Sequence, residues 1–299
     1  MTYIIENANI LQDRMITKTS LLIANGKISS LKPVYKRYRF IRMNAAPYIM
    51  TPTPTLLLKE FPLHLSFQET KAYFIEEFIL KGCTTFITLA NVQQEQALSK
   101  EIKRIKTRLL NSPIDYIIGV RIPVRLLTPS FLRSCKREKV PAIFVEIKQV
   151  DELYKLPWGW IREAMFPFNS PLVPLFINDD EREKNQMKSE WRKVLVKEKI
   201  PSINDELAEN EPIPYSALTK IGIYPKKSSL HQGSGLSYNF YLKSREIRNI
   251  EEVELFHYHR HMLVITVHKG EVLRANDYLD FRPGYGEHVK INTPSFYTS

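Results

Sequence analysis

MTPTPTLLLKE, residues 50–60, is the stretch at which this chain changes from one kind of structure to another. Residues 3–50 before it contain short apolar runs, which are typical of strands. From Pro52 to about Ile203, apolar runs alternate with amphipathic segments of helical spacing. Strands separated by helices of this length predict βαβ units and a parallel sheet covered by helices. The stretch therefore marks the entry into the largest apolar region of the chain.

The region before this stretch contains a strong hairpin signal. Asn25 and Gly26 lie between two apolar runs. A type I′ turn needs positive φ at both of its central residues, and this pair of residue types tolerates that conformation. The sequence therefore predicts a β-hairpin over residues 21–31.

Segments with the spacing of helices and strands alternate after the stretch. The first helix is predicted over residues 67–81, where it would bury Phe67, Tyr73, Phe74, Phe78 and Ile79 and stop at Gly82. Further helices are predicted over 93–110 and over 128–138, the latter beginning at a Thr-Pro pair that suits the cap and first turn. Strands are predicted over 83–90, 115–122, 140–147 and 172–179. The charged segment 179–200 has few apolar positions and predicts an exposed helix.

The composition is that of a globular chain with excess positive charge. The 299 residues are 43% hydrophobic, which is enough to bury a full core. The net charge of +11 suggests a polyanionic partner. However, the cations are spread over 36–39, 100–108 and 193–199 without a nucleic-acid-binding motif, and we interpret them as solvated faces.

Targeting signals and cysteines point to a soluble protein. The chain has no run of about 18 apolar residues, and its first residues lack the pattern of a signal peptide. We therefore expect a cytoplasmic protein with no membrane partner. Cys83 and Cys135 lie in segments that read as core or helix, so we expect reduced thiols rather than a disulfide.

The last third of the chain carries the most specific motifs. SALTKIGIYPKKSSLHQGS, residues 216–234, is similar to the passage from the last barrel helix to the sandwich in the amidohydrolase superfamily, in the dihydropyrimidinase, allantoinase and dihydroorotase group. LVITVHKGEVLRANDYLDFRPGYGEHVK, residues 263–290, resembles that family's closing hairpin and tail. ANGKISSL at 24–31 and GCTTFITLAN at 82–91 resemble its earlier motifs. The matching residues are Gly222, Tyr224, Pro225, Lys227, Gly233, Gly270, Val272, Pro283, Gly284 and Gly286.

The resemblance implies an α/β fold with two parts. Residues 1–51 and 221–299 would form a small β-sandwich from both chain ends, and residues 52–220 a domain derived from a (β/α) barrel. About 160 residues lie between Thr51 and Glu211, whereas a full barrel typically needs roughly 200 to 250, so three strands are expected to be missing. An open half-barrel would expose strand edges unless helices or a second copy cover it. We therefore expect a homodimer.

The resemblance also implies where a metal centre would lie. In catalytic members, histidines, a carboxylated lysine and an aspartate hold one or two metals that activate water. The two first-strand histidines fall on Leu58 and Glu60, with His64 four residues further along. Other candidate positions are Glu146 and Lys148 on the fourth strand and Asn178 and Asp179 on the fifth. Because these residues do not supply the family's ligand set, we expect the hydrolytic centre to be lost, leaving no catalytic residue and no cofactor.

FHYHRH, residues 256–261, is the sharpest local feature. In a strand, His257, His259 and His261 would point to one face, spaced to share a transition metal. The alternative is a surface strand or loop without a ligand.

Three further features have structural interpretations. Asp179, Asp180 and Glu181 are typical of a helix N-terminus. Trp158 and Trp160 favour packing over a ligand groove. HQGSGLS, residues 231–237, lacks the strand-to-helix context of a phosphate loop.

Two main functions follow from the sequence. The first is a non-catalytic amidohydrolase-like protein, a pseudoenzyme that binds or scaffolds a protein partner. The second is a metal-dependent hydrolase acting on a cyclic amide or another non-peptide C–N bond. Its rebuilt site would hold zinc or another divalent transition metal on the three histidines of 257–261, or on His64 with Glu60. A third hypothesis is a basic protein that binds nucleic acid or another polyanion.

Overall fold

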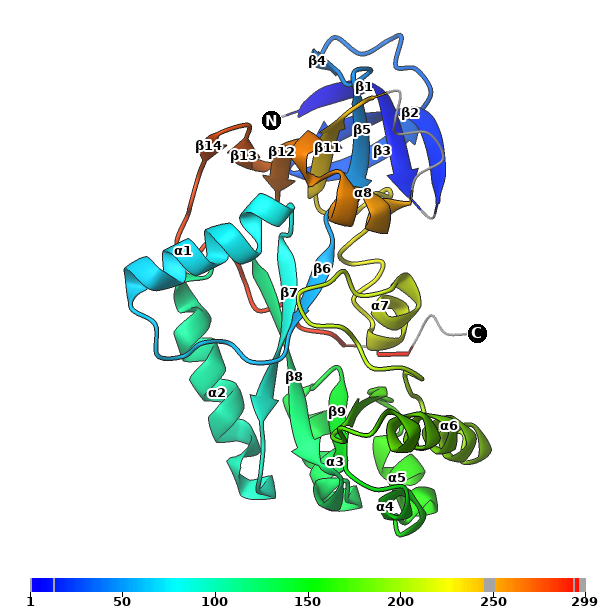
Figure 1. Ribbon diagram of the computed structural model, residues 1–299. Helices are drawn as coiled ribbons and strands as arrows, with labels where there is room; N and C mark the ends of the chain where they lie inside the picture. Colours follow the sequence, from blue (N-terminus) through cyan, green and yellow to red (C-terminus); the bar gives the residue numbers. More distant parts are fainter. Residues whose placement is uncertain (1, 13, 245–250, 293, 296–299) are drawn as a thin grey trace.

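The computed structural model describes residues 2–12, 14–244, 251–292 and 294–295. Within these ranges the chain forms two sheets, sheet A and sheet B. Figure 1 shows sheet A at the top and sheet B with most of the helices below it. The architecture is a mixed α/β fold, a half-barrel joined to a second, mostly antiparallel sheet, as expected from the sequence.

Sheet A is built from strands of both ends of the chain. Its order is β14-β13-β12-β11-β5-β1-β2-β3, and β4 also pairs with β1. The strands are β1 (Thr2–Gln12), β2 (Met15–Ala24), β3 (Lys27–Lys32), β4 (Ile41–Asn44), β5 (Tyr48–Pro52), β11 (Tyr238–Leu242), β12 (Leu263–His268), β13 (Glu271–Ala275) and β14 (Tyr278–Leu279). β11 runs antiparallel to β5 with Phe240 opposite Met50, which joins the two ends in one sheet. The expectation of a sheet shared by both ends is thus confirmed.

The predicted hairpin is present between β2 and β3. Asn25 and Gly26 form the turn with φ of 52° and 69°. Both values lie in the left-handed region that a type I′ turn requires. The strands diverge from regular pairing between Leu22 and Ile23, where the register shifts.

Sheet B is parallel, with the order β10-β9-β8-β7-β6. Its strands are β6 (Thr55–Leu58), β7 (Thr85–Asn91), β8 (Asp115–Pro123), β9 (Ile143–Ile147) and β10 (Leu172–Phe176). Nearly every residue of these strands is buried. Continuous apolar strands of this kind are typical of parallel sheets that are covered on both faces.

Helices cover the outer face of sheet B (Figure 1). The α-helices are α1 (Phe67–Glu77), α2 (Leu98–Arg108), α3 (Pro129–Glu138), α4 (Asp151–Tyr154), α5 (Trp158–Met165), α6 (Glu181–Lys197), α7 (Tyr215–Ile221) and α8 (Glu252–Tyr258). Short 3-10 turns are η1 (Ile79–Lys81), η2 (Glu95–Ala97), η3 (Leu109–Asn111), η4 (Val124–Leu126) and η5 (Arg260–Met262). The side chain of Thr128 accepts a hydrogen bond from the N–H of Phe131, which confirms the predicted cap of α3.

Two predictions about burial need correction. Phe67 was expected on the buried side of its helix, but it is the first residue of α1 and is 47% exposed. The segment 179–200 does form a helix, yet α6 is not exposed all round, because Met187, Trp191 and Leu195 are buried against the core. Apolar residues at these helical spacings form a narrow buried stripe even in a charged helix.

The inner face of sheet B is covered by the chain itself. Residues 201–213, here called the closing segment, run from one edge of the sheet to the other. At the β10 edge, the N–H of Ile203 donates to the carbonyl of Leu172 (2.8 Å). At the β6 edge, the N–H of Ile213 donates to the carbonyl of Thr55 (2.9 Å). Some of the backbone hydrogen-bonding groups at both edge strands of the half-barrel are therefore paired within one chain.

The closing segment also fills the space that a larger barrel would enclose. Its side chains pack against the inner face of sheet B with α7 and the C-terminal segment. The apolar residues that these parts contribute are Ile203, Leu207, Ile213, Ala217, Leu218, Ile221, Ile223, Val289 and Ile291. The half-barrel thus has a solid interior, and its apolar face does not need a second copy of the chain to cover it.

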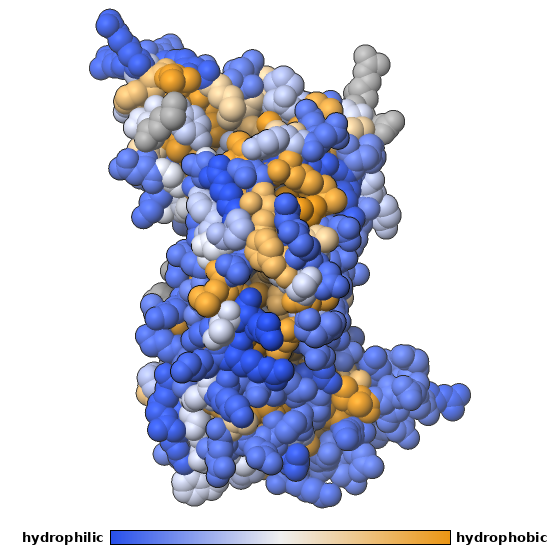
Figure 2. Space-filling view, turned by 90° about the vertical axis from the view of Figure 1, so that its left-hand side faces the viewer, coloured by the Kyte–Doolittle hydropathy of each residue, from blue (hydrophilic) through white to orange (hydrophobic). Residues whose placement is uncertain are grey.

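The face of the molecule drawn in Figure 2 is mainly hydrophilic. In this view, hydrophilic residues cover most of the lower body, and the hydrophobic residues lie mostly in the upper half of the molecule. Cys83 and Cys135 are both buried and free, as expected. Among the helices of the described ranges, none combines the length and the apolar character that crossing a bilayer requires.

Candidate functional site

The carboxyl ends of β6 to β10 are where the implied metal centre would lie, and in the described part of the chain no three potential metal ligands gather there. Leu58 is buried in the apolar core at the end of β6. Glu60 and His64 are exposed in the loop that follows. At the start of α1, hydrogen bonds with Ser66 lower the pKa of Glu69, and the nearby His64 adds a smaller contribution in the same direction.

The fourth- and fifth-strand candidates have partners of their own. Glu146 on β9 forms an ion pair with Arg121 on β8. The side chain of Asn178 donates to Glu183 at 2.6 Å and accepts from the N–H of Asp180. Asp180 caps α6, which confirms the prediction of a helix N-terminus for the acidic run. The ion pair thus links two neighbouring strands, and Asn178 and Asp180 stabilise the start of α6.

Glutamates of the closing segment occupy the ends of the outer strands. Glu206 accepts a hydrogen bond from the N–H of Phe176 at 2.6 Å, where β10 ends. Glu209 accepts from the N–H of Lys59 at 2.9 Å, where β6 has just ended. The closing segment thus occupies backbone donors at the carboxyl ends of the outer strands, the end at which (β/α) barrels carry their functional residues.

The three histidines of 257–261 do not share one face, because their segment is helical rather than extended. Glu251 and Glu254 form a capping box that starts α8, and Leu255 and Phe256 are buried beneath it. Successive helical residues rotate by about 100°, so the period-two alignment expected for His257 and His259 is lost. Among the residues that the structure describes, no group of three or more His, Cys, Asp or Glu side chains is arranged to hold a metal ion.

His259 and His261 remain neighbours. Their ring centroids lie 6.0 Å apart. The Nδ1 atom of His259 is buried without a hydrogen-bond partner among the described residues. His257 instead packs edge-on against Phe256. The structure therefore brings together two of the four candidate histidines and leaves His257 and His64 apart.

Trp158 and Trp160 differ in their surroundings. Trp158 is buried, and its Nε1 donates to the carbonyl of Leu153 at 2.8 Å. Trp160 is 67% exposed on the same helix. The expected packing role therefore holds for the first tryptophan only.

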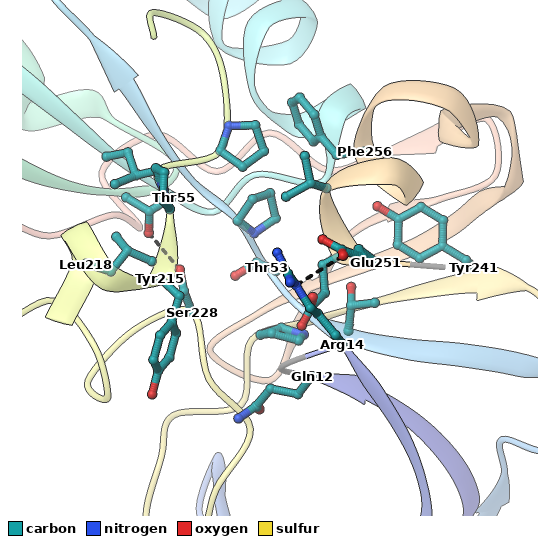
Figure 3. Close-up of a pocket in the computed structure, with 18 residues that line it drawn as sticks. Gln12, Arg14, Thr53, Thr55, Tyr215, Leu218, Ser228, Tyr241, Glu251 and Phe256 are labelled. Atoms are coloured by element: carbon teal, nitrogen blue, oxygen red, sulfur yellow. Dashed lines mark hydrogen bonds and ion pairs between the residues drawn. The ribbon is translucent and has the colours of Figure 1, made fainter. Parts of the chain in front are cut away.

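An apolar pocket lies at the opposite, amino-terminal end of the strands, between sheets A and B (Figure 3). Its volume is about 430 Å³. The walls come from β5, the start of β6, the end of the closing segment, α7, β11 and α8. The lining residues that define this apolar pocket are Pro52, Thr53, Pro54, Thr55, Pro212, Ile213, Pro214, Tyr215, Leu218, Tyr241, Val253 and Phe256.

Polar groups are placed at the rim of the apolar pocket. Arg14 and Glu251 form an ion pair with a distance of 3.1 Å (Figure 3). The hydroxyls of Thr55 and Ser228 lie 2.8 Å apart on another side of it. Sequence reasoning missed this site, because its lining comes from segments far apart in the chain and carries no local motif.

A buried ionic cluster also lies at this end of the strands. Asp115, the first residue of β8, is fully buried. It pairs with Lys227 and, at 2.7 Å, with Lys269, and it accepts from the N–H of Glu287 at 2.9 Å. His268 lies 3.5 Å away.

The electrostatics of this cluster favour an ionised carboxylate. Burial alone would raise the pKa of Asp115. His268 and Lys227 lower the pKa by more than burial raises it, so it lies well below the ordinary value. Burial lowers the pKa of His268 despite its acidic neighbour, which keeps the imidazole neutral. The cluster joins β8, β12, the segment after α7 and the C-terminal segment.

Comparisons with known proteins identify the fold. No family model matches the sequence, and no curated protein does. Among solved structures, a D-hydantoinase matches with a TM-score of 0.59 at 14% identity, over 97% of this chain and 99% of that chain. The dihydropyrimidinase from Brevibacillus agri NCHU1002 matches with a TM-score of 0.61 at 12% identity, over 98% and 99%. A D-hydantoinase from a Bacillus sp. AR9 gives 0.59 at 12% identity, over 97% and 99%.

Identities this low carry information about the fold and leave the activity open. The matches agree with the order of motifs in the sequence and with the half-barrel and shared sheet described above. The chain therefore has the fold of the D-hydantoinases and the dihydropyrimidinase, as the motifs in its sequence led us to expect.

Proposed function

We propose that this protein is a non-catalytic, amidohydrolase-like binding module whose ligand site is the apolar pocket between the two sheets. The observation that carries the proposal is the closing segment. It fills the interior of the half-barrel and places Glu206 and Glu209 on backbone donors where the family's reaction takes place. Substrate would have to displace packed apolar side chains to reach that end of the strands.

The apolar pocket has the properties of a small-molecule site. Its volume of about 430 Å³ lies within the usual range of roughly 300 to 1,000 Å³ for such sites. Proline and aromatic side chains supply a largely apolar lining, and a few polar groups at the rim can orient a ligand. The ligand class that fits is a small, mainly apolar molecule with one or two hydrogen-bonding groups.

The proposal is tested with N-phenyl-naphthylamine, an uncharged probe whose fluorescence rises in apolar surroundings. Val253 lines the apolar pocket and is 47% exposed, so Val253→Trp fills the pocket with little change to the core. We expect saturable binding by the native protein and at least tenfold weaker binding by this variant. Val196→Trp is the matched control, because Val196 is 73% exposed on α6 and does not line the apolar pocket.

Two outcomes would contradict the proposal. One is the absence of saturable binding to the native protein. The other is equal binding by native protein and Val253→Trp when thermal unfolding shows that both are folded.

A second candidate function is a metal-dependent hydrolase of a cyclic amide or another non-peptide C–N bond. It is supported by the 6.0 Å spacing of the His259 and His261 rings and by the unpartnered Nδ1 of His259. Zinc or another divalent transition metal would be the cofactor, since imidazole nitrogens are suitable ligands. His257 and His64 are further candidate ligands from the sequence, although within the described ranges no three such side chains form a group that could hold a metal.

Elemental analysis of the purified protein separates the two functions. The hydrolase predicts stoichiometric metal that is lost in His259→Ala, together with turnover of a cyclic amide such as hydantoin. Metal content that is unchanged in His259→Ala, or a metal-loaded protein without turnover, would count against it. His231→Ala is the control, because His231 bonds to Ser229 and lies outside the helical segment.

We propose a cytoplasmic location, supported by two buried, free thiols that suit a reducing compartment. A protein partner for the binding module stays a proposal. Recovery of the tagged protein in the cytoplasmic fraction tests the location, and co-purification of a second protein with it tests the partner.

A further inference from the structure

A second hollow, about 570 Å³ in volume, lies next to the apolar pocket and has a different chemistry. It is bounded by the β2–β3 turn, the segment after α7 and the C-terminal segment. The residues that define this basic pocket are Lys27, Lys226, Lys227, Lys269, Lys290, Ser228, Ser229, Ser234, Ser237, Gly233, Gly235, His231 and Glu287. Five lysines from four separate parts of the fold thus surround one hollow.

The basic pocket has excess positive charge. Glu287 is the carboxylate within its described lining, and it pairs with Lys269 at 3.2 Å. Asp115 lies behind the wall and pairs with Lys227 and Lys269. Five ammonium groups against these two carboxylates leave an excess of three positive charges. Clefts lined by one sign of charge attract and concentrate small ions of the opposite sign.

Three of the lysines are available to a ligand. Among the described residues, Lys27, Lys226 and Lys290 have no carboxylate within 4.0 Å. Lys226 donates to the carbonyl of Lys290 at 3.0 Å, which draws their two segments together at the edge of the hollow. An ammonium group that donates one hydrogen bond keeps two further protons for an acceptor.

The segment 231–237 supplies a floor in which two glycines leave the backbone uncovered. It is fixed against the β2–β3 turn, where the N–H of Gly233 donates to the carbonyl of Ile28 at 2.7 Å. The N–H of Leu236 donates to the carbonyl of Gly26 at 3.0 Å. A Cβ atom added at Gly233 or Gly235 would meet nothing within 4 Å, so the backbone here faces open space.

We propose that the basic pocket binds the oxyanion group of a small phosphorylated molecule. Ammonium groups from Lys27, Lys226 and Lys290 neutralise the anion. The hydroxyl of Ser228 can add a hydrogen bond to it, because either hydroxyl can be the donor in its contact with Thr55. The glycine-containing segment 231–237 gives no phosphate signal by its sequence context, and tertiary contacts place it beside the lysines. A charge excess of three suits a diphosphate better than a carboxylate.

Inorganic pyrophosphate is the probe, and isothermal titration calorimetry is the measurement. We expect the Lys27→Ala, Lys290→Ala double variant to bind pyrophosphate at least tenfold more weakly than the native protein. The matched control is Lys100→Ala with Lys103→Ala on the exposed face of α2, which removes the same charge elsewhere. All four lysines are exposed, so these variants preserve the core.

Gly235→Glu provides an independent test. Gly235 does not have positive φ, and its Cβ has open space, so a side chain is accommodated without backbone strain and places a carboxylate in the hollow. Loss of pyrophosphate binding in this variant is the expected result. If the pocket double variant and the control double variant bind pyrophosphate equally weakly, the effect is one of net charge and the proposal is overturned. Absence of pyrophosphate binding by the native protein would also overturn it.

The uncharged naphthylamine probe reports on the apolar pocket alone. Thr53 and Ser228 line both hollows, but neither Lys27 nor Lys290 lines the apolar one. Failure of the pyrophosphate experiment is therefore distinguishable from failure of the proposed function.

Discussion

Asp115 holds four parts of the fold together at a single fully buried carboxylate. Removing one member of a buried, hydrogen-bonded ion cluster leaves the remaining charges without compensation. We predict that Asp115→Asn lowers the free energy of unfolding by about 3 to 5 kcal/mol, because Lys227 and Lys269 lose their shared counter-ion. Urea unfolding at neutral pH measures the change, and Asp277→Asn on the exposed β13–β14 turn is the control.

The same residue predicts a dependence of stability on pH. The pKa of Asp115 is lower in the folded state than the value of about 3.9 expected when unfolded. Its stabilising contribution is therefore fully present above about pH 4 and is lost as the pH falls towards the folded-state pKa. The difference in stability between native protein and Asp115→Asn should shrink on acidification from pH 5 to pH 3. A constant difference would contradict the assignment.

Gly286 illustrates a close backbone approach. An added Cβ would lie 1.9 Å from the carbonyl oxygen of Ile114, a main-chain atom that cannot move aside. We predict that Gly286→Ala costs about 1 to 3 kcal/mol, or detaches the C-terminal segment from β8. Gly159→Ala is the control, because its Cβ meets nothing within 4 Å and alanine favours helix α5 by about 0.5 to 1 kcal/mol. Unfolding midpoints that move equally in both variants would refute this prediction.

At the scale of elements, the closing segment decides what the half-barrel can do. Trp191 of α6 is fully buried, and its Nε1 donates to the carbonyl of Ile203 at 3.0 Å. Trp191→Phe leaves that carbonyl without its partner and creates a small void, at a cost of about 1 to 3 kcal/mol. We expect amide hydrogen exchange across residues 201–213 to accelerate about tenfold or more.

The control for this experiment is Trp160→Phe on α5, where the ring is 67% exposed. Its exchange pattern should match that of the native protein. Unchanged protection of residues 201–213 in Trp191→Phe would mean that α6 does not hold the closing segment in place.

At the scale of the whole molecule, the homodimer expected from the sequence stays a prediction. The reason for it was an uncovered barrel interior, and in the described residues the closing segment and the C-terminal segment fill that interior. A dimer would have to form through another surface. Light scattering at micromolar concentration decides the matter, because a mass near 35.0 kDa would contradict the dimer and twice that mass would support it.

Much of the fold follows from local patterns. The turn at Asn25 and Gly26 and the caps at Thr128 and Asp180 depend on residues within four positions of one another. The same is true of the parallel strands, each marked by a short apolar run between helices. Where local signals competed, the secondary structure predicted from the sequence was wrong. The alternating histidines suggested a strand, but the capping box at Glu251 and burial of Leu255 and Phe256 favour a helix.

The sequence by itself determined much of the order of strands and helices, because turn sterics, helix capping and hydrophobic periodicity act over a few residues. The joining of both chain ends in one sheet was implied by the resemblance of the motifs to a known family, since those local patterns do not reach across the chain. Only the tertiary structure decided that residues 201–213 close the half-barrel. It alone brought Asp115 to lysines 112 and 154 positions away and set an apolar pocket beside a basic one. These features depend on contacts between distant segments, whose free energy is set by mutual burial and by charge pairing at low dielectric.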